Sequence, residues 1–102
     1  MKLTKPIFII VSILSSFSLL SQDIQISGTV EEESSGEAIP NISIVWESSS
    51  DKKLSSSNSY GFYSISVPAG PGRLVFSSFG FKTLAKQFRN LNKNIVLNIS
   101  LK

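Results

Sequence analysis

The side chains that could do chemistry in this sequence are carboxylates and aromatic rings, because the chain contains no cysteine and no histidine. The carboxylates gather in one short stretch, at Glu31, Glu32, Glu33 and Glu37. Such a run could hold a hard cation such as Ca²⁺, which prefers oxygen ligands. Calcium loops space their ligands in a regular pattern, and "EEESSGE" lacks one. We therefore expect a solvated acidic loop here, with no metal and no cofactor.

The aromatic residues form the second candidate site. A set of five could stack against sugar rings or nucleic-acid bases: Tyr60, Phe62, Tyr63, Phe79 and Phe81. In an alternating strand every second residue faces the core, so Tyr63 belongs inside together with Phe76. We expect these rings to be mainly structural, with one or two ring edges exposed.

Catalysis has little support. Without histidine the chain lacks the commonest general base, and without cysteine it lacks a thiolate nucleophile. Serine, aspartate and lysine are present, but no motif places a base beside a nucleophile. Two Asn-x-Ser patterns begin at Asn41 and Asn98, and both lie in predicted strands. We expect no enzymatic activity.

The first residues have the composition of a secretory leader. Lys2 and Lys5 precede an apolar run over 7–20, and the small Ser21 follows it. A membrane anchor is the alternative, but a spanning helix needs about 20 apolar residues and this run is shorter and interrupted by serines. We predict a signal peptide at 1–21, cleaved close to Gln22, and one exported domain at 22–102 that does not span the membrane.

Beyond the leader the charges nearly balance, because Lys2 and Lys5 supply two of the ten Lys and Arg residues that face seven Asp and Glu. A nucleic-acid partner is not expected, since such a surface needs a clustered basic face.

The rest of the chain has the period-two pattern of half-buried strands. Five stretches place apolar residues on one face: Ile24, Ile26, Gly28 and Val30; Ile42, Ile44 and Trp46; Tyr63, Ile65 and Val67; Leu74 and Phe76; and Ile95, Leu97, Ile99 and Leu101. Residues 84–91 are ambiguous, and we interpret them as a strand running into a loop. About fifteen large apolar side chains are available for the core, so few remain for a deep pocket.

Turn residues separate these strands. Asn58 to Gly61 predicts a turn with a backbone conformation that favours glycine, and "PAGPG" predicts another. Pro68 and Pro71 lack amide donors, so neither fits a central ladder. The Ser-rich stretch before Asn58 predicts a solvated loop beside a short edge strand. Short strands with frequent turns predict a small antiparallel β-sandwich or barrel.

From Ile26 to Leu101 the sequence resembles the carboxypeptidase-regulatory-like domain, which implies a seven-stranded, transthyretin-like (prealbumin-like) β-sandwich. The resemblance lies in "ISGTVEEESSGEAIPNISI", "SNSYGFYSISVPAG", "RLVFSSFGFKT" and "NIVLNISL". The matching motif positions are Gly28, Val30, Pro40, Gly61, Phe62, Pro68, Gly70, Phe76, Ser77, Gly80 and Phe81, with Tyr63 following the turn. Tyr60 stands where many members place Asp, which argues against a side-chain cap at that position.

The resemblance is strongest to the domain that precedes the plug in TonB-dependent outer-membrane receptors of Bacteroidota. It implies no catalytic activity, a location in the periplasm or on the periplasmic face of the outer membrane, and contact with a receptor or its energising machinery. Lys102 falls where the plug would begin, so the chain is either a fragment or a stand-alone relative. A free periplasmic or cell-surface module that binds protein or carbohydrate is the alternative, and a peptidase accessory domain is a third.

We expect contact through a sheet edge or an exposed loop. The closing strand, Ile95 to Leu101, is flanked by Lys93 and Lys102. Charges at an edge prevent self-association, and they could keep this edge free for a partner.

Overall fold

The computed structural model describes residues 23–102, and all the regular structure in this range is β. The strands are β1 Asp23–Glu32, β2 Ser43–Glu47, β3 Lys52–Ser56, β4 Phe62–Pro68, β5 Gly70–Ser77, β6 Leu84–Leu91, β7 Ile95–Val96 and β8 Ile99–Leu101. The predicted leader, 1–21, lies outside the described residues. Within 23–102 the chain forms no helix that could cross a bilayer.

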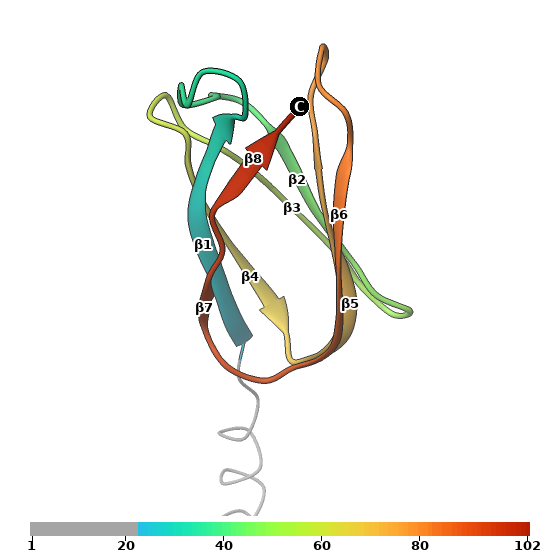
Figure 1. The fold of residues 1–102 in the computed structure, drawn as a ribbon. Helices are drawn as coiled ribbons and strands as arrows, with labels where there is room; N and C mark the ends of the chain where they lie inside the picture. The colour runs from blue at the N-terminus through green and yellow to red at the C-terminus, as the bar shows by residue number, and fades with distance from the viewer. Residues whose placement is uncertain (1–22) are drawn as a thin grey trace, which may run out of the picture.

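The strands form two sheets, which confirms the predicted β-sandwich (Figure 1). One sheet has the order β4-β1-β7, with β8 also paired to β1, and the other has the order β3-β2-β5-β6. β1 and β4 run antiparallel from Asp23↔Pro68 to Thr29↔Phe62. Pro68 therefore ends an edge strand, where its missing amide removes no central hydrogen bond.

The predicted closing strand differs from the expectation in two ways. It is split into β7 and β8, and both pieces run parallel to β1, so this sheet is mixed rather than purely antiparallel. The break lies at Leu97 and Asn98, where the Asn98 side chain rather than a backbone carbonyl accepts a hydrogen bond from the Thr29 amide (N–O distance 3.1 Å). Asn94 does the same for the Gln25 amide at 2.8 Å. The second Asn-x-Ser pattern thus begins at a residue that completes the sheet.

The core lies between the sheets and is filled by fifteen apolar residues among those described, as many as the alternation predicted. They are Ile24, Ile26, Val30, Ile39, Ile42, Ile44, Trp46, Tyr63, Ile65, Val67, Leu74, Phe76, Leu91, Ile99 and Leu101. Ile95 and Leu97 of the predicted closing face are only partly buried at its margin.

β6 settles the ambiguous stretch as a strand along its whole length. It pairs with β5 in regular register from Leu84↔Phe76 to Phe88↔Gly72, and the register then shifts before Gly70↔Leu91. Pro71 stands at this shift, which is where a proline is tolerated in an interior strand.

Candidate functional site

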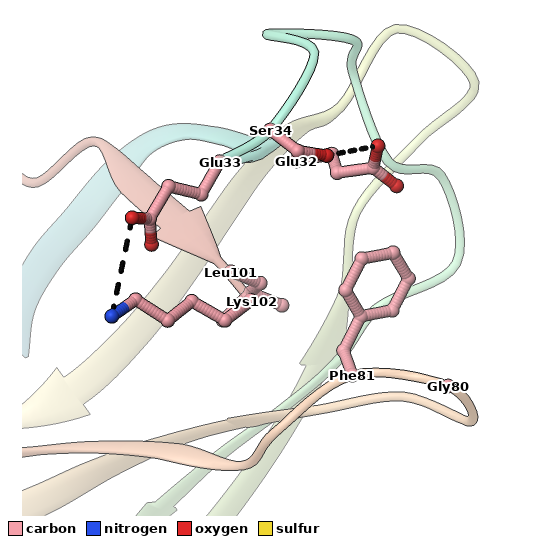
Figure 2. Close-up of a pocket in the computed structure, with 7 residues that line it drawn as sticks. All are labelled: Glu32, Glu33, Ser34, Gly80, Phe81, Leu101 and Lys102. Atoms are coloured by element: carbon pink, nitrogen blue, oxygen red, sulfur yellow. Dashed lines mark hydrogen bonds and ion pairs between the residues drawn. The ribbon is translucent and has the colours of Figure 1, made fainter.

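An open groove of about 490 Å³ lies at the end of the sandwich where the described chain ends (Figure 2). One wall comes from the end of β1 and the loop after it, through Glu32, Glu33 and Ser34. The opposite wall is the β5–β6 hairpin, from which the Phe81 ring projects toward Glu32 (Figure 2). Leu101 and Lys102 of the β8 end complete the lining.

Backbone hydrogen bonds fix these walls. The Glu33 amide donates to the Leu101 carbonyl at 2.8 Å, and the Lys82 amide donates to the Lys102 carbonyl at 2.7 Å. The Lys102 ammonium lies 4.0 Å from a Glu33 carboxylate oxygen, with both side chains mostly exposed. An ion pair of this kind contributes little to stability. Backbone hydrogen bonds thus join the walls of the groove, and most of its lining side chains are exposed or partly exposed.

The acidic stretch predicted to be a loop is a loop only in part, because Glu31 and Glu32 end β1 and pair with β8. The Glu32 carboxylate accepts hydrogen bonds from the Ser34 and Ser35 hydroxyls, at 2.8 and 2.9 Å. Glu31, Glu33 and Glu37 are exposed. Within the part of the chain described here, no three acidic side chains converge as metal ligands. The carboxylates thus shape the loop after β1.

The turn between β3 and β4 requires a glycine at position 61 for two reasons, its backbone conformation and the lack of space for a side chain. Gly61 has φ 81°, and a Cβ there would lie 2.8 Å from the Val30 carbonyl oxygen and 2.9 Å from the Ala38 Cβ. The predicted backbone conformation is confirmed. The turn also has the side-chain cap that Tyr60 argued against, because the Asn58 side-chain oxygen accepts from the Tyr60 and Phe62 amides at 2.9 and 3.0 Å.

Tyr63 joins the sheet to the broken closing strand. Its ring packs edge-on against Phe76, with centroids 5.3 Å apart and planes at 82°. Its hydroxyl donates to the Leu97 carbonyl oxygen at 2.6 Å. Burial disfavours the phenolate and raises the pKa of Tyr63 from 10.0 to about 12. Tyr63 is therefore a buried structural residue whose hydroxyl proton is held in a hydrogen bond.

The absence of a side chain at Gly28 allows the Leu97 carbonyl to lie close to β1. Gly28 pairs with Tyr63 across β1 and β4. A Cβ at Gly28 would lie 2.1 Å from the Leu97 carbonyl oxygen, an impossible contact. The glycine of the opening strand therefore makes room for the chain crossing between β7 and β8.

The five aromatic residues separate into core and surface. Only 4% of Tyr63 is exposed and Phe81 is partly buried, whereas Phe62 is 55% exposed and Tyr60 and Phe79 extend into solvent. Phe62 is therefore not a core residue, because the pleat directs it to the outer face when Tyr63 points inward. The exposed rings come from two loops at the same end of the sandwich, the β3–β4 turn and the β5–β6 hairpin (Figure 1).

The remaining motif residues shape connections. Gly70 and Gly80 have φ of 126° and 90°, and they sit at the β4–β5 and β5–β6 turns. Pro40 lies in the β1–β2 loop, directly before Asn41, whose φ is 59°. These residues position turns and offer no chemistry of their own.

The fold and these turn residues define a small two-sheet β-sandwich domain in which the sequence motifs serve the architecture. The model of the CarboxypepD_reg-like domain matches residues 26–102. The chain belongs to this family, which confirms the predicted resemblance to the carboxypeptidase-regulatory-like domain.

Solved structures share the fold at low identity. A chlorocatechol 1,2-dioxygenase from Pseudomonas putida has 13% identity and a TM-score of 0.64 over 79% of this chain and 60% of that chain. A putative carbohydrate binding protein from Bacteroides uniformis has 19% identity and a TM-score of 0.62 over 78% and 41%. A DUF3823 family protein from Bacteroides ovatus has 16% identity and a TM-score of 0.59 over 78% and 44%.

These likenesses concern the fold alone, and the chain spans only part of the length of each of these structures. A search of curated proteins gives no match.

Proposed function

We propose that the chain is a non-catalytic, exported contact module that serves as the periplasmic N-terminal or accessory domain of a TonB-dependent outer-membrane receptor. Its family membership supports the module, and the likeness of its turn motifs to the domain ahead of the receptor plug supports the setting. Its partners are the receptor or the machinery that energises it.

The observation that carries this proposal is a filled core beneath a surface that retains large apolar side chains. The fifteen core residues leave no deep pocket in the described domain, and the groove at the end of β8 is open. Five large apolar residues are nevertheless exposed: Leu54, Tyr60, Phe62, Phe79 and Val96. Tyr60 and Phe79 lie in two loops at the same end of the sandwich, and we infer that they contact another macromolecule there.

Site-specific photo-cross-linking in the native periplasm tests the proposal. A photoreactive residue in place of Phe79, which is fully exposed, should give adducts with an outer-membrane receptor or its energising partner. The matched control is the same replacement at Ala69, an exposed residue at the opposite end of the sandwich. A deletion strain should show impaired uptake of the receptor's ligand. Normal uptake, together with no adduct from any exposed position, would refute the receptor setting.

Carbohydrate binding is the second function that a specific observation favours. The outer face of the β4-β1-β7 sheet carries Gln25, whose side-chain amide donates to the Ser64 hydroxyl and accepts from the Ser66 hydroxyl. The exposed Phe62 lies on the same face, opposite Thr29. A ring beside hydroxyl and amide groups suits a sugar, and one solved neighbour is described as a putative carbohydrate binding protein. Glycan-array binding that is lost in Phe62→Ala would establish this alternative.

A further inference from the structure

The two long sides of the sandwich are built differently. On one side β3 and β4 close the sheets together, and the Ser55 hydroxyl donates to the Ser64 carbonyl oxygen at 2.7 Å. On the other side β6 pairs only with β5, and β7 and β8 pair only with β1. The partly buried apolar residues that pack against the core come from the elements of this second side: Phe81, Leu84, Phe88, Ile95 and Leu97. The sandwich is thus open between β6 and the broken closing strand.

Of the two edges at the open side, β6 offers the longer unbroken backbone. Its register with β5 is regular over Leu84–Phe88, whereas β7 and β8 have two and three residues. An edge strand directs one row of amides and carbonyls away from its sheet, where an extended peptide can pair with them. The Leu84–Phe88 edge is the better template for an added strand.

A cation stands in the middle of this edge and faces the open side. Lys86 pairs with Leu74, which is fully buried, so Lys86 lies on the core-facing side of its sheet. Its neighbours on that face are Leu84 and Phe88, both half-buried. The edge therefore presents an apolar, a cationic and an apolar position in alternation.

The charges on and beside this edge are mainly positive, and Glu33, which pairs with Lys102, is the acidic residue near its Leu84 end. All seven acidic residues lie at or before Asp51, and every lysine and arginine after the leader lies beyond it. Five of these cations are on β6, its flanking loops and the end of β8: Lys82, Lys86, Arg89, Lys93 and Lys102. Among residues 23–102 only Lys102 of this group has an ion-pair partner. The open side is a basic strip beside a free strand edge.

We propose that the Leu84–Phe88 edge of β6 binds an extended acidic segment of a partner protein by strand addition. A carboxylate of that segment pairs with Lys86, and apolar residues two positions before and after it cover Leu84 and Phe88. This inference rests on the proposed function, for which it names the surface and the chemistry of the partner. Like-signed side chains along the edge also keep two copies of this chain from pairing there.

Synthetic peptides test the recognition chemistry on the exported full chain. The probe is the eight-residue peptide Ser-Val-Ser-Glu-Ser-Val-Ser-Ser, which places Val, Glu and Val on one face of a strand. Its matched competitor has Lys in place of Glu. The acidic peptide should bind at least tenfold more tightly in an NMR titration and should slow hydrogen exchange in Leu84–Phe88. The same acidic peptide with N-methylated backbone amides should not bind, because it cannot add to the ladder.

A charge reversal with a matched control sharpens the test. Lys86→Glu should reverse the preference toward the competitor peptide that carries Lys. Lys53 is the matched control, because it also stands on an edge strand opposite a fully buried residue, Trp46. Lys53→Glu should leave the peptide preference unchanged, since β3 lies at the closed side of the sandwich. Equal effects of the two variants, equal binding of the methylated peptide, or binding to phosphatidylglycerol vesicles without peptide binding would each overturn the inference. So would a dimer of this chain that Lys86→Glu dissolves.

Failure here is distinguishable from failure of the proposed function. A photoreactive residue at Ala85, which is exposed on β6, reports on this edge. Receptor adducts from position 79 but none from position 85 would keep the receptor module and reject the β6 edge.

Discussion

The turn glycine Gly61 gives the sharpest test of how the fold is specified, because Gly36 provides a matched control. Both residues have positive φ, 81° and 75°. A Cβ at Gly36 would meet nothing within 4 Å, whereas a Cβ at Gly61 would press on the Val30 carbonyl and on Ala38. Replacing each with alanine therefore separates the strain of the backbone conformation from the steric contact.

The expected magnitudes follow from these contacts. Left-handed backbone costs an L-residue about 1–2 kcal/mol, and this applies to both variants. At Gly61 the Val30 carbonyl cannot move freely, because it accepts a hydrogen bond from the Ile39 amide at 3.0 Å while the Val30 amide donates to Gly61 at 2.8 Å. Weakening these two bonds costs about 0.5–1.5 kcal/mol each. We expect Gly36→Ala to lose about 1–2 kcal/mol and Gly61→Ala about 2–5 kcal/mol.

Urea denaturation of the two variants and the parent measures the difference. With a slope of about 1 kcal/mol per molar for so small a domain, the midpoints of the two variants should differ by about 1–3 M. Gly61→Val should lose more stability than Gly61→Ala, since a branched side chain disfavours positive φ more strongly. If Gly36→Ala and Gly61→Ala unfold at the same urea concentration, the inference that β1 packs closely against the Gly61 turn is wrong.

Three further predictions concern burial, titration and processing. Phe76→Ala should cost about 3–5 kcal/mol in the same melts, whereas Phe62→Ala should cost less than about 1 kcal/mol, and equal losses would contradict their opposite faces. The pKa of Tyr63 is raised to about 12 in the folded state, so this phenol ionises in the unfolded chain before it ionises in the folded one. The contribution of Tyr63 to stability should therefore be constant well below pH 10.0 and should fall as the pH rises toward 12. Tyr63→Phe should remove this fall while losing about 0.5–1.5 kcal/mol at neutral pH with its hydrogen bond, and an unchanged alkaline slope would contradict the assignment. The intact mass of the exported protein should correspond to a chain that begins close to Gln22. Retention of the leader in mature material would favour a membrane anchor instead.

The sequence predicted the sandwich because its strongest signal is alternation, and alternation reports directly on which residues face a core. It could not locate the break in the closing strand, since Ile95, Leu97, Ile99 and Leu101 alternate without interruption. That break depends on a carbonyl of one strand passing over a glycine of another, which is a contact between residues 69 positions apart. The cap at Asn58 was missed for a simpler reason, because the expected cap position was Tyr60.

β6 shows how a local irregularity can disguise a strand. In "LAKQFRNL" the apolar positions Leu84, Phe88 and Leu91 have the spacing of one face of a helix. The register explains this spacing, because three steps along β6 from Phe88 to Leu91 match only two steps along β5. The extra residue shifts the phase of the pleat, so that Leu91 enters the core although its parity differs from that of Leu84 and Phe88. The same shift ends the regular edge at Phe88, so the bulge that made the stretch ambiguous also sets the length of the edge that β6 can offer to an added strand.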